Sequence, residues 1–250
     1  MKTILIIVLI TLAVQETTAQ KSEKIESDRP GKAQTSYVIP NQMLQVETGF
    51  DWLKRDKNMV EIQHPEIVMK YGLFRRLELR TRILTQTDKF QNPSYSQSGL
   101  EPIEIGLKAL VTEGKGLIPH TSLTAQFGIP GFASKAFIAR KVFPKLRLNL
   151  ENDLTNKSTL EYNVAAEWDG YGDNPEWMIA VSPHFELGEK WQIFVEAFSS
   201  MQQNKEPETG ADGGVSYWLT NNVMIDLSGG VGISNAAPKR FANIGFSFRL

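Results

Sequence analysis

The chain has 250 residues, of which 41% are hydrophobic and 22% are charged, and its formal net charge is −1. This length is compatible with a single domain if the fold is a β-barrel. The near-neutral charge gives no support for nucleic-acid binding, so no nucleic-acid partner is expected. Because cysteine is absent, disulfides, thiolate metal sites and a cysteine nucleophile are excluded.

The first 19 residues have the features of a secretory signal peptide. Lys2 supplies a positive charge, residues 4–14 (ILIIVLITLAV) are apolar, and Ala19 ends a small-residue cleavage site. The apolar stretch is too short to span a bilayer as a helix. We expect residues 1–19 to be removed on export. We expect residues 20–40, which are polar and aperiodic, to form an N-terminal segment in the periplasm.

From residue 41 to residue 250, apolar and polar residues alternate with a period of two, which is typical of strands with two different faces. In the first such stretch Val46, Thr48 and Phe50 lie on one face, and Glu47 and Gly49 lie on the other. The pattern predicts twelve strands, at residues 42–52, 67–73, 77–83, 103–111, 122–129, 146–153, 160–168, 177–185, 191–198, 212–219, 223–231 and 242–250. An even number is typical of bacterial single-chain barrels.

The predicted connections differ in length in a regular way. Those at 74–76, 112–119, 152–158, 188–190 and 220–222 are mostly short, whereas those at 53–66, 86–99, 130–144, 169–176, 199–209 and 232–239 are mostly longer. Short periplasmic turns that alternate with long external loops are typical of transmembrane barrels. The basic loop 130–144 either folds into the mouth, contacts lipopolysaccharide phosphates through Lys135, Arg140 and Lys141, or is simply solvated.

The polar face of the strands carries too much charge for the core of a soluble barrel. Glu78, Arg80 and Arg82 follow one another on one face, and burying unpaired charge is costly. An apolar face toward lipid and a charged face toward a wet lumen avoids this cost. The sequence therefore predicts an all-β fold, an up-and-down transmembrane antiparallel β-barrel of about twelve strands. A soluble β-sandwich is the alternative.

Strand parity places a set of charged residues in the lumen, where they would line a solute pathway. They are Glu78, Arg80, Arg82, Glu104, Lys108, Arg147, Glu151, Glu161, Glu167, Glu196, Asp212 and Asp226. Acidic residues predominate, so a continuous pore would favour cations. A packed network of cross-strand ion pairs that fills the lumen is the alternative.

Two arginines at the ends of the mature chain are candidates for long-range contacts. Arg29 could bridge lumen carboxylates, which would make residues 20–40 a plug in the periplasmic mouth; the alternative is a mere spacer. The last strand must pair with the first, because an open edge in lipid leaves backbone groups unsatisfied. We expect Arg249 to lie between Asp226 and Glu47 and to fix this pairing.

Short motifs distributed over nearly the whole mature chain resemble those of a bacterial outer-membrane transporter family named for the MetA pathway of phenol degradation. The motifs are Asp28-Arg29-Pro30, Tyr37-Val38-Ile39-Pro40, Gln45-Val46-Glu47-Thr48-Gly49-Phe50, Lys70-Tyr71-Gly72-Leu73, Leu77-Glu78-Leu79-Arg80, Val195-Glu196-Ala197-Phe198, Asp226-Leu227-Ser228-Gly229-Gly230-Val231-Gly232 and Gly245-Phe246-Ser247-Phe248-Arg249-Leu250. The resemblance implies an outer-membrane barrel with a transport role, for small aromatic or hydrophobic compounds.

The sequence predicts a passive outer-membrane channel and no enzyme, cofactor or metal site. His64, His120 and His184 do not have ligand spacing. A closed barrel with a structural or adhesive role is the first alternative, and a lipid hydrolase is the second, although His120 and Ser122 both point inward, away from lipid. The expected partners are outer-membrane lipid, lipopolysaccharide, the barrel-assembly machinery and an unidentified small solute.

Overall fold

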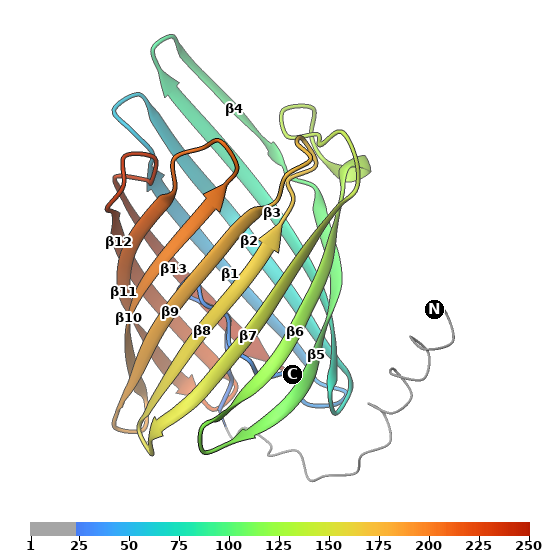
Figure 1. Ribbon diagram of the computed structural model, residues 1–250, viewed down its shortest axis with the longest axis vertical. Helices are drawn as coiled ribbons and strands as arrows, with labels where there is room; N and C mark the ends of the chain where they lie inside the picture. Colours follow the sequence, from blue (N-terminus) through green and yellow to red (C-terminus); the bar gives the residue numbers. More distant parts are fainter. Residues whose placement is uncertain (1–23) are drawn as a thin grey trace.

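The structure, a computed structural model, describes residues 24–250. The predicted signal peptide at 1–19 lies outside the described residues. Twelve antiparallel strands close into a barrel, and one further strand extends it on one side (Figure 1). The strands are β1 (Leu44–Lys54), β2 (Met59–Phe74), β3 (Leu77–Gln91), β4 (Ser94–Leu100), β5 (Ile103–Lys115), β6 (Ile118–Ile129), β7 (Phe143–Thr155), β8 (Ser158–Glu167), β9 (Glu176–Leu187), β10 (Trp191–Gln202), β11 (Glu208–Thr220), β12 (Val223–Gly232) and β13 (Arg240–Arg249).

The strands follow one another around the barrel in chain order. Each strand pairs with its neighbours in sequence, except that β3 pairs with β4 near one end and with β5 near the other. The barrel closes where β1 pairs with β13, with Val46 opposite Phe248 and Gly49 opposite Gly245. This pairing is called the seam below. The predicted fold class, an up-and-down barrel of twelve strands, is confirmed.

The two ends of the barrel have connections of different length. At the end where β1 begins and β13 finishes, called the terminal end, the five turns contain two or three residues each. At the opposite end, called the loop end, the connections include residues 130–142, 168–175 and 233–239. A short 3₁₀ helix, Pro130–Phe132, lies in the first of these loops. Within residues 24–250, no helix is long and apolar enough to cross a bilayer.

Two of the predicted long loops are wrong. Most of residues 53–66 belong to β1 and β2, and residues 86–99 form the hairpin of β3 and β4. These stretches extend past the rim of the barrel at the loop end (Figure 1). Beyond the rim the outward face of β3 does not meet lipid, and it carries polar residues such as Thr85, Thr87 and Lys89. The alternation of apolar and polar residues therefore stops there, although the backbone pairing with β2 continues.

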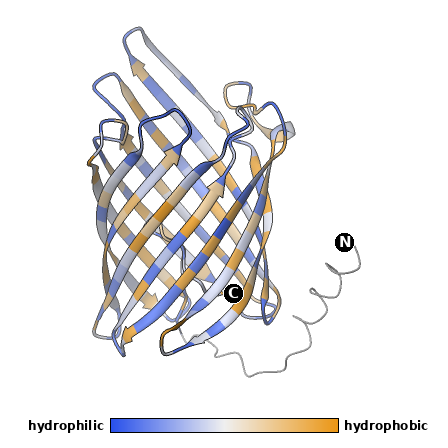
Figure 2. Ribbon diagram, in the orientation of Figure 1, coloured by the Kyte–Doolittle hydropathy of each residue, from blue (hydrophilic) through white to orange (hydrophobic). Residues whose placement is uncertain are grey.

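The outer surface of the barrel carries an apolar band. Along the strands, hydrophobic residues alternate with hydrophilic ones (Figure 2). Leu107, Val164, Ile179 and Val195 point outward and are 38–58% exposed, whereas their strand neighbours Lys108 and Glu196 point inward and are buried. Such a surface is stable only against lipid, because exposed contiguous apolar area is unfavourable in water. Together with the closed ladder, the band marks a transmembrane barrel.

Leu107→Arg is expected to lower the free energy of unfolding by about 2–4 kcal/mol, because a charge on the lipid face near the bilayer midplane loses its hydration. The control is Gln126→Arg on the neighbouring strand β6, which faces a space within the lumen and should cost less than about 1 kcal/mol. Unfolding by guanidinium in lipid vesicles measures both. Equal costs for the two variants would contradict the assignment of faces.

Candidate functional site

The chain before β1 lies inside the barrel. Residues 24–43, called the inner segment, enter the lumen at the terminal end, where Ile25 packs against Trp218 and Met224. The segment turns back near Gly31 and returns to the terminal end, where the Gln42 N–H donates to the carbonyl of Gly72. Figure 1 shows this chain in blue within the barrel. Residues 24–40 of the predicted N-terminal segment thus lie inside the lumen, where the plug hypothesis places them, and residues 20–23 lie outside the described residues.

The first leg of the inner segment, residues 24–30, is held by ion pairs around Asp28. The carboxylate of Asp28 forms ion pairs with Lys70 at 2.7 Å, with Lys108 at 3.6 Å and with Arg80. Lys70 pairs in addition with Glu47, and Arg80 lies 3.3 Å from Glu78. All six side chains are buried. They form the charge cluster: Asp28, Glu47, Lys70, Glu78, Arg80 and Lys108.

The turn of the inner segment is fixed by one carboxylate of the wall. Oxygens of Glu196 accept the backbone N–H of Lys32 at 2.7 Å and that of Ala33 at 2.6 Å. Next along the chain, the Gln34 N–H donates to Asn163, whose amide donates back to the Gln34 carbonyl. The backbone N–H groups of Lys32 and Ala33 have no acceptor in a neighbouring strand, so Glu196 supplies the acceptor for both.

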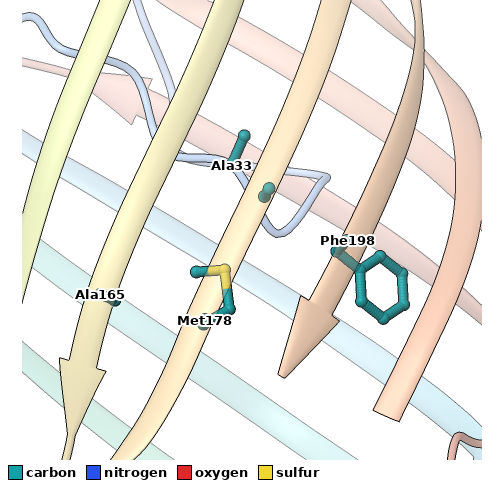
Figure 3. Packing of buried hydrophobic residues seen from close by; sticks show 5 residues of the cluster. Ala33, Ala165, Met178 and Phe198 are labelled. Atoms are coloured by element: carbon teal, nitrogen blue, oxygen red, sulfur yellow. The ribbon is translucent and has the colours of Figure 1, made fainter. Parts of the chain in front are cut away.

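An apolar cluster lies beside this turn. Ala33 packs with Ala165, Met178 and Phe198, which come from β8, β9 and β10 (Figure 3). These strands present small or apolar residues to the lumen at this level, whereas β1, β2, β3 and β5 present the charge cluster. The inner segment thus has ion pairs on one side of the lumen, whereas on the other it packs against apolar side chains beside its hydrogen bonds to Glu196 and Asn163.

The second leg, residues 34–40, contacts β3, β5, β6 and β7. The Ser36 hydroxyl donates to Glu151 at 3.1 Å and lies 2.8 Å from Nδ1 of His120. The ring of Tyr37 stacks on His120 with 4.2 Å between centroids. Lys108 donates to the Thr35 carbonyl at 2.6 Å. Ser122, on the same strand as His120, is buried and accepts a hydrogen bond from the Asn149 amide at 3.2 Å.

Cavities lie on both sides of the inner segment. The loop-side cavity, about 290 Å³, is bordered by Lys32, Asp51 and Arg147. The terminal-side cavity, about 720 Å³, is bordered by Tyr37 and His120. The two have no lining residue in common, because the inner segment and the charge cluster lie between them.

A third cavity, the mouth cavity of about 310 Å³, lies at the loop end. Phe137, Phe143, Trp168 and Tyr171 line it, and it shares Glu104, Lys145 and Glu167 with the loop-side cavity. Its wall includes the loop 168–175, where Asp169 accepts the N–H groups of Tyr171 and Gly172 at 2.8 and 3.1 Å. Partial burial opposes ionisation of Asp169, but these two bonds hold its pKa below the usual value.

The remaining predicted lumen residues occupy three places. Arg82, Glu104, Arg147 and Glu167 form ion pairs beside the loop-side cavity, with 2.9 Å between Arg82 and Glu104 and 2.7 Å between Arg147 and Glu167. Glu161 lies 3.6 Å from His184 on the adjacent strand β9. Asp226 pairs with Arg29 at 3.4 Å. Asp212 lines the loop-side cavity, and within the described chain its Oδ1 has no hydrogen-bond partner.

The expected position of Arg249 between Asp226 and Glu47 is not found. Its guanidinium donates to the side chain of Asn222 in the turn between β11 and β12, at 2.8 and 3.0 Å. Asp226 is paired with Arg29, and Glu47 with Lys70. The reason is the reach of the side chains. Arg249, the last residue of β13, lies level with the turns at the terminal end, whereas the inner segment carries Arg29 further into the lumen, where Asp226 lies.

Two lumen residues with important contacts were absent from the sequence-based set. Lys145 lies 2.7 Å from Glu104, and Glu66 pairs with both Arg29 and Arg82. Both lie at the edges of strands that were expected to be shorter. Lys145 precedes Arg147 by two residues, so continuing the period-two pattern one step further would have placed it in the lumen.

Among the described residues, no group of three or more histidine, cysteine, aspartate or glutamate side chains could hold a metal ion. His64 lies 2.7 Å from Thr87 at the loop end, far from the contacts of His120 and His184. The site is therefore characterised by a segment held inside a charged lumen.

A closed antiparallel barrel of twelve strands with an apolar outer band defines a transmembrane β-barrel of the bacterial outer-membrane type. The fold is similar to that of the COG4313 outer membrane channel from Pseudomonas putida F1, with a TM-score of 0.70 and 10% identity over 89% of this chain and 99% of that one. It is also similar to the KdgM porin, with a TM-score of 0.54 and 8% identity over 82% of this chain and 98% of that one.

The family described as "Putative MetA-pathway of phenol degradation" matches residues 27–250, and the chain belongs to this family. The resemblance noted in the sequence is thereby confirmed. A comparison with curated proteins finds no match.

Asp28→Asn is expected to lower the free energy of unfolding by about 3–5 kcal/mol, because it leaves the cations of Lys70, Arg80 and Lys108 buried with less counter-charge. The control is Asp173→Asn, which removes an exposed ion pair with Lys141 and should change nothing measurable. Denaturant titration in vesicles compares the two. A loss for Asp28→Asn as small as that of the control would show that the cluster does not anchor the segment.

Proposed function

We propose that this chain is an outer-membrane channel for the passive passage of small solutes, and not an enzyme. The observation that carries the proposal is the pair of cavities on opposite sides of the inner segment. A barrel filled only for stability would be packed throughout its length. Within residues 24–250, the inner segment and the charge cluster lie between the two spaces, so a modest displacement of the segment would connect them. The likeness in fold to two outer-membrane channels is consistent with this role.

The solute class that fits best is small aromatic or hydrophobic compounds that carry a polar group. The family description refers to phenol degradation. The mouth cavity offers four aromatic rings, and the passage beyond it is lined by Glu104, Lys145 and Glu167. Rings stack favourably on aromatic side chains, and a hydroxyl or carboxylate could exchange hydrogen bonds with the charged residues beyond.

The proposed location is the bacterial outer membrane, with the terminal end in the periplasm and the loop end outside. Export by the signal peptide at residues 1–19 and insertion by the barrel-assembly machinery are parts of this proposal. Lipid and lipopolysaccharide are the proposed partners of the outer surface. At the loop end, Lys135 and Arg140 are exposed on the loop 130–142, where they could contact lipopolysaccharide phosphates.

A closed barrel with an adhesive role is the second candidate. It is favoured by the extension of β2, β3 and β4 beyond the rim, on which Tyr95 is half exposed. The lipid hydrolase has less support. The Ser36 hydroxyl beside His120 donates to Glu151, and both side chains lie inside the lumen, away from the lipid that a hydrolase of this kind would have to reach.

Glu196→Ala is expected to raise the open probability of single channels in planar bilayers at least fivefold. The substitution leaves the N–H groups of Lys32 and Ala33 without their acceptor, at a cost of about 1–3 kcal/mol each, and so loosens the turn of the inner segment. It breaks no contact between strands, so the barrel should still fold.

The matched control is Asp212→Ala on β11, directly opposite Glu196 in the ladder. It removes the same charge from the same level of the lumen without releasing the segment. A common change in both variants would mean that charge, not release of the segment, controls conduction. No conductance in the parent or in either variant would favour the closed barrel.

Tyr171→Ala is expected to lower the flux of small aromatic acids into liposomes at least threefold and to leave the flux of a sugar of similar size unchanged, because a stacking surface in the mouth is lost. Tyr95→Ala is the control, since Tyr95 is equally exposed but lies on the extension. Liposome swelling with matched solutes measures the fluxes. Equal losses for aromatic and sugar solutes would contradict aromatic selectivity.

A further inference from the structure

The seam contains a slot in the barrel wall that is filled by a side chain of the inner segment. Gly49 on β1 and Gly245 on β13 face each other across the seam. A Cβ atom on Gly49 would overlap the guanidinium of Arg29, and one on Gly245 would overlap its Nε. The guanidinium therefore lies against bare backbone in the place that two side chains would otherwise occupy. These two residues are called the glycine slot.

Carboxylates lie on both sides of the glycine slot. Asp226 on β12 is 3.4 Å from one terminal nitrogen of Arg29, and Glu66 on β2 is 3.6 Å from the other. The Arg29 side chain is 10% exposed and that of Asp226 is fully buried. The contacts of Arg29 thus extend over four neighbouring strands, β12, β13, β1 and β2, and its guanidinium links the two outer ones, β12 and β2, electrostatically.

The contact between Arg29 and Asp226 could form one further hydrogen bond. Nε of Arg29 and Oδ2 of Asp226 both lack a hydrogen-bond partner in the described structure, and both border the position of a Gly245 Cβ. A small movement would give a second parallel N–H···O bond, the fork geometry that guanidinium and carboxylate prefer. The ammonium of a lysine could not make this pair of bonds.

The residues beside Arg29 attach to the last strand. The Ser27 hydroxyl lies 3.2 Å from that of Ser247, and the amide of Asn243 donates to the Pro30 carbonyl at 3.0 Å. Asp28, between them, is bound to cations on β2, β3 and β5. Residues 27–30 therefore link the end of the barrel sheet to its beginning.

We propose that the glycine slot is a guanidinium-binding site of the seam, and that Arg29, by filling it, promotes closure of the barrel. The seam joins β1 and β13, the strands that are furthest apart in sequence, and pairing between such distant strands forms slowly. Until the seam has formed, the backbone groups at the edges of β1 and β13 are unpaired in lipid. A side chain that bridges β12 and β2 brings these edges together. The first leg is in this view a permanent part of the wall, and the turn and second leg are the parts that move.

The test follows closure of the mature chain, refolded into vesicles, by the mobility difference between folded and unfolded barrels in unheated gels. Arg29→Ala and Arg29→Lys should close at least threefold more slowly than the parent. Lys32→Ala, an exposed cation of the same segment, should close at the parental rate. Gly49→Ala should match Arg29→Ala, because its methyl group displaces the guanidinium.

The decisive experiment adds free methylguanidinium, at millimolar concentration, to the refolding variants. It should restore the closure rate of Arg29→Ala and leave Gly49→Ala slow, since only the first variant has an empty slot. If Arg29→Ala does not fold at all without the ligand, the appearance of folded barrel with it supports the proposal. Failure of methylguanidinium to rescue Arg29→Ala would overturn it, and so would parental closure of Arg29→Ala combined with altered ion selectivity.

Discussion

The structure depends on how the backbone of the inner segment is satisfied inside the barrel. The segment pairs with no strand over most of its length, so its N–H groups need acceptors from elsewhere. Carboxylates of the wall supply them: Glu196 accepts two at the turn, Glu78 accepts that of Ile39, and Glu47 accepts that of Asp28. Many of the acidic residues of the lumen thus serve as hydrogen-bond acceptors for the backbone of the inner segment.

Buried carboxylates need cations in turn, and the charge cluster contains them. Lys70, Arg80 and Lys108 come from three strands and meet Asp28 of the first leg. Removing any one of these charged side chains leaves the others buried without a counter-charge. The charge cluster is therefore stable when complete and unfavourable when any ion pair is missing. The apolar side of the lumen, around Ala33 and Phe198, has no such requirement. On the side of β8 to β10 the segment is instead held by hydrogen bonds to Glu196 and Asn163, without buried cations.

The sequence allowed the wall of the barrel to be predicted because lipid on one side and water on the other impose a period of two on every strand. The parity that placed Leu107 outside and Lys108 inside needed no knowledge of long-range contacts. The extent of β3 and β4 was missed because outside the bilayer neither face has to be apolar. The partner of Arg249 was missed because residues 24–43 have no periodicity from which their path could be inferred, so the arrival of Arg29 at Asp226 was not foreseeable.

The extension formed by β2, β3 and β4 gives the barrel an uneven rim. β2 and β3 contain 16 and 15 residues, whereas β8, β12 and β13 contain 10 each, and the wall in Figure 1 is accordingly tall on one side only. The mouth cavity is bordered by the loops that follow β6, β8 and β10 and by Glu101 and Pro102, which follow β4 at the base of the extension. The tip of the β3–β4 hairpin, at Ser94, is six residues from its base at Leu100, or about 20 Å, so a bulky ligand attached at the tip would be held away from the mouth.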